Sequence, residues 1–213
     1  MPRLVGADYR TRVRSPGERL VEVLDREPLR RAAITPILDA LVPTELAAMI
    51  AALPEAALRA RLYVAFADAP PVTLTDLVPP EVPPLSEVIY HQGTHSRLAF
   101  ALFEKRFCRP PASHGSDELW GFNHQPLAWF TGPGYFVVHE DGARGAAIDY
   151  REVPPERPPQ WPKIKPNDRG LSRFVYRDMV DYIRRVSRDV FIGATHRNGE
   201  ATGKLFVLWR EGP

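Results

Sequence analysis

The sequence has little cysteine, little net charge and no long apolar run. Cys108 is the only cysteine, so no disulfide can form within the chain, and a reducing cytoplasm is the simplest compartment. The 28 Lys and Arg residues nearly balance the 26 Asp and Glu residues, so no concentrated basic surface for a nucleic acid is expected. No apolar run approaches the ~18 residues of a membrane span. No apolar segment of a secretory signal follows the amino-terminal arginines. We therefore expect a soluble, cytoplasmic protein.

Motifs for catalysis, metals and cofactors are also missing. There is no G-x-S-x-G nucleophile motif, and the glycines of "GPGYFVV" precede an expected strand rather than a helix, which excludes a phosphate cradle. His91 and His95 stand four residues apart, but Gln92 occupies the position where a zinc protease motif has its glutamate. No further residues at metal-ligand spacing follow. We predict no metal and no cofactor, and whether the two histidines share a helix face stays open.

Proline is the residue in excess, and it divides the chain. The 23 prolines are roughly twice the average frequency of ~5%. A cluster at 69–84 predicts an extended connector, because proline removes a backbone donor and disfavours helix in the residue before it. A second cluster at 153–170 predicts a long loop. The expected division is a helical segment with its connector over 1–84, and a second domain over 85–213.

The first segment shows apolar residues at helical spacing. The pattern predicts short helices over residues 35–42, 44–53 and 54–66. Thr35 and Thr44 are the expected amino-terminal caps. Each helix has an apolar stripe that must be covered, either by the rest of the chain or by a partner protein.

The second domain is expected to begin with a helix over about 85–107, with a break near Gly93, and to continue as antiparallel strands. The strands are expected in short aromatic and β-branched runs bounded by turn residues: ELWGFN, LAWFTG, GYFVVHEDG, GAAIDYREV, SRFVY, DYIRRV, DVFIGATHR and KLFVLWRE. The run RDMVDYIRRV also fits a short helix. Asn198-Gly199 predicts a hairpin turn. Seven or eight strands in this order favour a sheet that curls into a barrel.

The fold class is therefore α+β, with a helical amino-terminal layer followed by an antiparallel barrel or half-open cup. The segments "FEKRF", "GPGYFVV", "AAIDYREVP", "FVYRDMVDYIRRVSRDVFIGATHR" and "KLFVLWRE" resemble a group of bacterial lipocalin-like (calycin-type) proteins, over about 103–211. The resemblance implies a small barrel or cup with an interior cavity, and it implies no activity. This chain departs from the group in its helical amino-terminal segment and in its proline-rich insertion around Trp161.

The leading functional hypothesis is that the cup binds a small, largely apolar molecule. Large rings with polar tips are typical of such sites, although most of them also fit an ordinary core. The candidate ligand-binding residues are Trp120, Phe122, Trp129, Tyr135, Tyr176 and Phe191.

Two other classes remain open. One is an enzyme of secondary metabolism, of cyclase, isomerase or lyase type, because two apolar strand faces each end in a histidine suited to acid–base work. Its candidate catalytic residues are His139, His196, Asp149, Tyr150 and Arg173. The simpler interpretations are solvated histidines and an ion pair between Asp149 and Arg173. The other class is an interaction module that uses the amino-terminal helices, and a homodimer is also left open.

Overall fold

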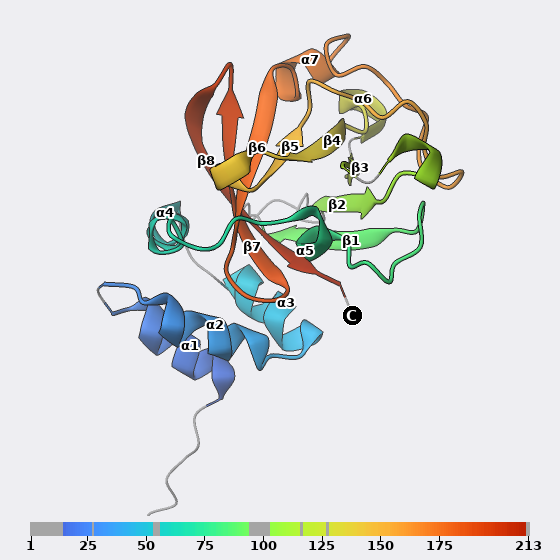
Figure 1. Ribbon diagram of the computed structural model, residues 1–213. Helices are drawn as coiled ribbons and strands as arrows, with labels where there is room; N and C mark the ends of the chain where they lie inside the picture. The colour runs from blue at the N-terminus through green and yellow to red at the C-terminus, as the bar shows by residue number, and fades with distance from the viewer. Residues whose placement is uncertain are drawn as a thin grey trace, which may run out of the picture.

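The chain folds into helices and a closed barrel of antiparallel strands. The computed structural model describes residues 15–26, 28–52, 56–93, 103–115, 117–126 and 128–211. Strands β1 to β8 follow one another around the barrel, and β8 pairs with β1 to close it (Figure 1). The predicted α+β fold with a lipocalin-like barrel is confirmed. In the described part of the chain, no helix is both long enough and apolar enough to cross a bilayer.

Each strand alternates its side chains between the barrel interior and the outer face. The strands are β1 (Val88–Gly93), β2 (Phe103–Cys108), β3 (Leu119–His124), β4 (Tyr135–Glu140), β5 (Ala146–Asp149), β6 (Met179–Arg185), β7 (Val190–Arg197) and β8 (Glu200–Arg210). Asn198 and Gly199 join β7 to β8 with φ values of 54° and 82°, which is the positive-φ pair of the predicted hairpin turn. Glycine and asparagine tolerate this backbone conformation better than other residues.

The predicted helix over 85–107 is wrong. Its described parts form β1 and β2, which pair with each other in register from Val88↔Phe107 to Gln92↔Phe103. The same residues satisfy a period of two, because Val88 and Tyr90 on β1 both join the apolar interior. Pairing with distant strands decides between the two periods, and only the three-dimensional structure supplies that pairing. His91 therefore lies on a strand, and His95 lies outside the described residues.

Two predicted strands are single turns of helix. LAWFTG contains α6 (Ala128–Thr131), and SRFVY contains α7 (Ser172–Val175). Trp129 and Phe174 are exposed by 76% and 62%, so these aromatic side chains fill no sheet face. The aromatic content that predicted strands here belongs to turns at the end of the barrel (Figure 1). The predicted number of strands, seven or eight, agrees with the structure because two errors cancel: LAWFTG and SRFVY are not strands, and the helix predicted over 85–107 contains two strands instead.

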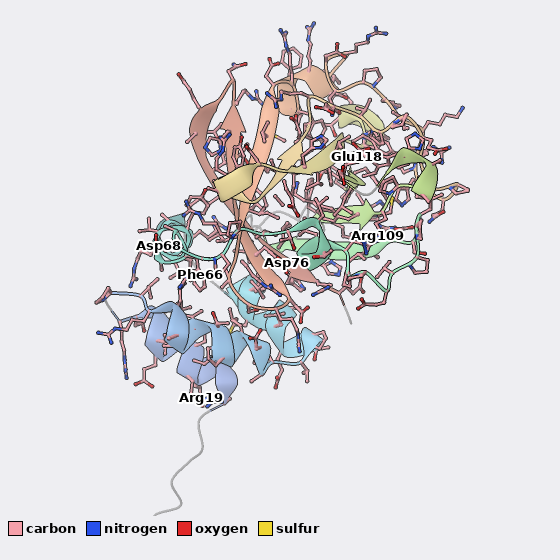
Figure 2. All side chains as sticks on the ribbon, in the orientation of Figure 1. Arg19, Phe66, Asp68, Asp76, Arg109 and Glu118 are labelled. Carbon is pink, nitrogen blue, oxygen red and sulfur yellow. The ribbon has the colours of Figure 1, made fainter. Side chains whose placement is uncertain are left out.

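The amino-terminal helices cover the outer face of β7 and β8. They are α1 (Pro16–Leu24), α2 (Arg31–Asp39), α3 (Pro43–Ala52) and α4 (Ala56–Ala65). Ile192 and Val207 face outward from β7 and β8 into an apolar cluster with buried residues of this layer. Phe66, at the end of α4, is 1% exposed and lies between the helices and the barrel (Figure 2). The helical stripes are thus covered within the chain.

The start of α2 differs from the prediction. The helix begins at Arg31, and Pro36 stands inside it instead of at its first position. The hydroxyl of Thr35 donates to the carbonyl oxygen of Val186 at 2.7 Å, so this threonine ties the helix to the barrel and does not cap it.

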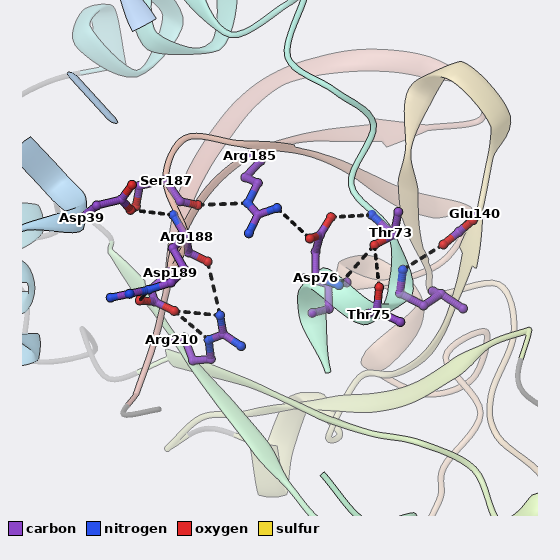
Figure 3. Close-up of polar contacts among 12 residues, drawn as sticks. Asp39, Thr73, Thr75, Asp76, Glu140, Arg185, Ser187, Arg188, Asp189 and Arg210 are labelled. Carbon is purple, nitrogen blue, oxygen red and sulfur yellow. Dashed lines mark hydrogen bonds and ion pairs between the residues drawn. The ribbon is translucent and has the colours of Figure 1, made fainter. Parts of the chain in front are cut away.

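A short helix within the proline-rich connector closes one end of the barrel. It is α5 (Leu74–Leu77), capped by Thr73 and Asp76, which accept each other's backbone N–H groups. Leu77 is fully buried in the interior cluster, and its carbonyl oxygen accepts the Tyr90 hydroxyl at 3.0 Å. Asp76 pairs with Arg185 of β6 at 2.7 Å (Figure 3). The expected boundary at residue 84 stays a prediction.

Candidate functional site

The half of the barrel next to α5 is packed with aromatic rings. The rings of Tyr90 and Phe191 lie 5.7 Å apart, and those of Phe107 and Phe136 lie 5.2 Å apart, between centroids. A side chain at Gly121 would collide with the Phe136 ring, so this glycine is what lets the ring cross the interior. These rings form a packed core, and the hydroxyl of Tyr90 among them already donates to the Leu77 carbonyl oxygen.

The other half holds a buried polar cluster, which we call the interior polar cluster. Its members are Lys105 on β2, Asn123 on β3, Tyr150 directly after β5, Asp181 on β6 and Thr195 on β7. Strand pairing brings them together: Lys105 lies opposite Asn123 in register, and Asp181 lies opposite Thr195. Asp181 is four residues along β6 from Arg185, which contacts α5. Measured along β6, Asp181 is about 13 Å from Arg185, at roughly 3.3 Å per strand residue, so the cluster lies away from the closed end.

The ammonium of Lys105 is fully coordinated by the cluster. Its Nζ donates to Oδ1 of Asn123 and to Oδ2 of Asp181, both at 3.2 Å, and to the hydroxyl of Tyr150. Three N–H donors thus meet three acceptors. Thr195 donates to the other oxygen of Asp181 at 2.8 Å, which holds the carboxylate in place.

Aromatic rings surround the same nitrogen. The ring centroids of Phe136, Tyr150 and Phe206 lie 5.5, 5.0 and 5.2 Å from Nζ, and that of Phe103 lies 5.5 Å away. Ring faces attract a cation, and their bulk excludes water from it. Phe103 is only partly buried, whereas the other three rings are buried. Phe103 is therefore the most accessible of the four rings around Nζ.

Burial sets the protonation chemistry of this cluster. It lowers the pKa of Lys105, and the charge of Asp181 opposes that change. Burial also raises the pKa of Tyr150 well above its ordinary value, and the Asp181 charge adds to the effect. The phenol therefore keeps its proton and acts as a hydrogen-bond donor, and the Lys105 ammonium releases a proton more easily than an exposed lysine does.

One polar group of the cluster has no partner. The Asn123 side chain is 1% exposed, and its Nδ2 has no hydrogen-bond partner among the described residues. The amide orientation follows from Lys105, because an ammonium only donates and must face the amide oxygen. The NH₂ group is therefore turned away from Nζ; it lies near enough to the Tyr176 hydroxyl to lower the pKa of that group, but no hydrogen bond of normal geometry joins the two.

Tyr176 extends the cluster toward α7. Its ring stacks on Tyr150 with centroids 5.4 Å apart and planes 12° from parallel. Gln125 donates to the Tyr176 hydroxyl at 2.8 Å. Burial raises the pKa of Tyr176 to about 12. A side chain at Gly134, whose φ is +56°, would collide with the Tyr176 ring, so this position favours glycine twice over.

The five predicted catalytic residues do not converge. His139 and His196 share their strand faces with the residues expected, but both faces are outer faces of the barrel. His139 lies 3.4 Å from Glu152, and the His196 ring packs edge-on against Tyr182. Of the five, Tyr150 alone is in the interior polar cluster.

The remaining two predicted catalytic residues also lie apart. Asp149 faces outward and accepts the Arg151 side chain at 2.9 and 3.0 Å, so the ion pair expected with Arg173 is replaced by one with Arg151. Arg173 lies on α7 with its guanidinium 4.6 Å from the Phe174 ring centroid.

The predicted ligand-binding aromatics fall into three places. Trp120, Phe122 and Tyr135 face outward and are covered by Trp161 of the proline-rich loop, in a cluster that also holds Cys108. Trp129 is exposed on α6. Tyr176 and Phe191 belong to the interior cluster.

Sequence reasoning missed Lys105, Asn123, Asp181 and Thr195. A period of two in "FEKRFC" would have found the first, because Phe103, Lys105 and Phe107 form one face in which a lysine stands between two phenylalanines. In "MVDYI", Asp181 likewise stands between Met179 and Ile183. A charged residue on an apolar strand face is the pattern to look for.

Metal sites and cavities outside the barrel add little. The described ranges contain no group of three or more His, Cys, Asp or Glu residues placed to hold a metal. His91 contacts Glu211 at 3.2 Å and Glu104 at 3.9 Å. One cavity of about 640 Å³ lies between α2 and the turn after β6, and another of about 250 Å³ lies beside His196.

Comparisons with known proteins found no matching family model, no matching curated protein and no matching solved structure. The barrel architecture therefore stands on the structure itself, and the resemblance to bacterial lipocalin-like proteins stays a prediction.

Proposed function

We propose that the barrel binds a small, largely apolar molecule whose carbonyl or carboxylate oxygen reaches the interior polar cluster. The observation that carries this proposal is the buried Nδ2 of Asn123, which has no partner among the described residues and belongs to the same cluster as the buried ammonium of Lys105. A buried donor without a partner costs about 1–3 kcal/mol, and an acceptor oxygen supplied by a guest removes that cost.

The surroundings define the rest of the guest. Rings of Phe103, Phe136 and Phe206 line the approach to Nζ, and they favour an apolar or aromatic body. The oxygen would accept from Asn123 and lie within reach of the ammonium, which favours a carboxylate or a polarised carbonyl over an alcohol.

The guest would enter at the end of the barrel opposite α5. Phe136 and Phe206 are held over Gly121 and Gly193, where any side chain would collide with them. Phe103 is partly exposed, so we expect its side chain to be the one that moves when the guest enters.

The observations favour this class over the two alternatives. Acid–base catalysis by His139, His196, Asp149 and Arg173 would need side chains that lie on outer faces or on α7 to meet Tyr150 inside. An interaction module would need an unpaired helical face, and buried apolar residues of α1–α4 form one cluster with residues of β7 and β8.

Titration with a fluorescent fatty acid, cis-parinaric acid, tests the proposal. We expect saturable binding to the full chain, weakened at least tenfold by Asn123→Leu, which keeps the branched shape of the side chain and removes both its NH₂ donor and the oxygen that accepts from Lys105. His139→Ala and His196→Ala are matched controls on the outer face and should bind like the parent.

The companion measurement is native mass spectrometry of the purified protein, where a co-purified small molecule would identify the natural guest. If Asn123→Leu folds and binds the fatty acid as tightly as the parent, the interior polar cluster is not the site and the proposal fails.

A further inference from the structure

Lysine is rare in this chain, and the one at the interior polar cluster differs from the others. Only Lys105, Lys163, Lys165 and Lys204 are lysines among the 28 basic residues, and all the others are arginines. Lys163, Lys165 and Lys204 are exposed, whereas Lys105 is 2% exposed. An arginine stays charged in proteins, while a buried lysine can release its proton and become a nucleophilic amine.

We propose that Lys105 forms a reversible covalent imine with an aldehyde or ketone, so that the barrel selects small apolar carbonyl compounds. The inference rests on the proposed function, because the carbonyl compound is a member of the guest class that binds there. It adds a chemical step that simple binding does not require.

The cluster contains the groups that the step needs. Asp181 takes one proton from the ammonium, and the amine lone pair attacks the carbonyl carbon while its oxygen takes up that proton. The resulting carbinolamine loses its hydroxyl with a further proton as water, and the C=N bond forms. Overall, the ammonium and the carbonyl give an iminium and one water. The positive charge stays beside Asp181, so the charge balance of the interior is unchanged.

Two neighbours are placed to assist. The Asn123 NH₂ group belongs to the same amide whose oxygen accepts from Nζ, and it has no partner among the described residues, so it can polarise the carbonyl oxygen of a guest that reaches past the amide. The Tyr150 hydroxyl contacts Nζ and lies 3.4 Å from Oδ2 of Asp181, so it bridges the amine and the carboxyl group that exchange protons. Thr195 holds that carboxyl group from the other side at 2.8 Å and acts as a positioning residue.

The ring environment selects the carbonyl compound and protects the product. Rings within 5.0–5.5 Å of Nζ leave space only for a slender or flat guest once Phe103 moves. The same rings exclude the water that hydrolyses an imine. We therefore expect hexanal and benzaldehyde to react, and a charged aldehyde such as glyoxylate to react poorly.

The scarcity of lysine makes a direct test possible. The full chain is incubated with hexanal and sodium cyanoborohydride, and its mass and peptide map are measured. An imine at Lys105, once reduced, adds the mass of the aldehyde less one oxygen atom on the peptide that contains Lys105. The variant with Lys163→Arg, Lys165→Arg and Lys204→Arg keeps Lys105 as its only lysine and should be labelled at the parental rate. Lys105→Met should lose this label.

The peptide map keeps the test decisive even if Lys105→Met does not fold, because it locates the adduct in the parent protein. Labelling of Lys105 at least tenfold faster than of the three exposed lysines supports the inference. Labelling confined to exposed lysines and the α-amino group overturns it. If cis-parinaric acid still binds in that case, only the covalent step is wrong; if it does not bind either, the proposed function fails as well.

Discussion

The Nζ atom of Lys105 and the Oδ2 atom of Asp181 lie 3.2 Å apart inside the barrel, and each side chain is only 3% exposed. Removing one partner of a buried pair leaves the other charge uncompensated, which costs about 3–5 kcal/mol. We therefore expect Asp181→Leu to lower the free energy of unfolding by that amount in urea denaturation. The double variant Lys105→Met/Asp181→Leu should recover most of the loss, since it leaves neither charge of the pair uncompensated.

A control for this pair is Arg177, which contacts Asp178 at 3.1 Å with side chains that are 62% and 44% exposed. Exposed ion pairs contribute about 0–1 kcal/mol, so Arg177→Ala should change stability little. If the two single substitutions at Lys105 and Asp181 lower the free energy of unfolding by amounts that add up to the loss in the double variant, the two charges are not coupled.

Buried tyrosines predict unfolding at high pH. Burial raises the pKa of Tyr90, Tyr135 and Tyr150, and that of Tyr176 to about 12, while an unfolded tyrosine titrates near 10. Between pH 10 and 12 the folded chain keeps protons that the unfolded chain has lost. Stability therefore falls as pH rises through this window, by about 1.4 kcal/mol per pH unit for each such tyrosine.

Tyr176→Phe removes one of these protons, so the free energy of unfolding should fall less steeply with pH, by about 1.4 kcal/mol per pH unit. The measurement is the free energy of unfolding from urea curves at several pH values between 9 and 12. Parallel pH profiles for the parent and for Tyr176→Phe would contradict the prediction.

Local patterns predicted the barrel where strands are joined by short turns. The β7–β8 hairpin at Asn198-Gly199 follows from residue types alone. Strand β1 could not be predicted in this way, because the residues after Leu85 fit both the period of a helix and the period of a strand. The pairing of β1 with β8, such as Tyr90 with Arg210, makes this segment a strand. Residues so distant in the sequence cannot be recognised as neighbours from a local pattern.

The site was harder to predict because both faces of several strands are apolar. On β4, Tyr135 and Val137 are buried under Trp161 outside the barrel, while Phe136 and Val138 are buried inside it. Alternation correctly groups His139 with Tyr135, but it does not say which group faces inward. The covering elements decide that, and they come from the proline-rich loop and the amino-terminal helices.

The cap formed by α5 should contribute strongly to stability. Leu77 is 0% exposed and packs in the interior cluster, and its backbone accepts the Tyr90 hydroxyl. Truncating a fully buried leucine costs about 2–5 kcal/mol, so Leu77→Ala should lower the free energy of unfolding by that amount. Val64 on α4 is 71% exposed, and Val64→Ala should have little effect. Equal effects of the two substitutions would mean that α5 is not a structural part of the barrel.

The close approach of Gly193 and Phe206 links the β7–β8 pair to the interior polar cluster. The two residues are opposite each other in register, and a side chain at 193 would collide with the Phe206 ring, whose centroid is 5.2 Å from Nζ of Lys105. Overpacking of a core costs about 1–3 kcal/mol, so Gly193→Ala should destabilise the protein by that amount.

A smaller side chain opposite should relieve this collision. We expect Gly193→Ala/Phe206→Leu to be more stable than the sum of the two single changes, since leucine leaves room for the added methyl. Glu200→Ala, at an exposed position on β8, should stay within about 0.5 kcal/mol of the parent. If the changes in the free energy of unfolding are strictly additive in urea denaturation, the Phe206 side chain does not occupy the space over Gly193. Phe206 would then not be one of the aromatic side chains that surround Lys105.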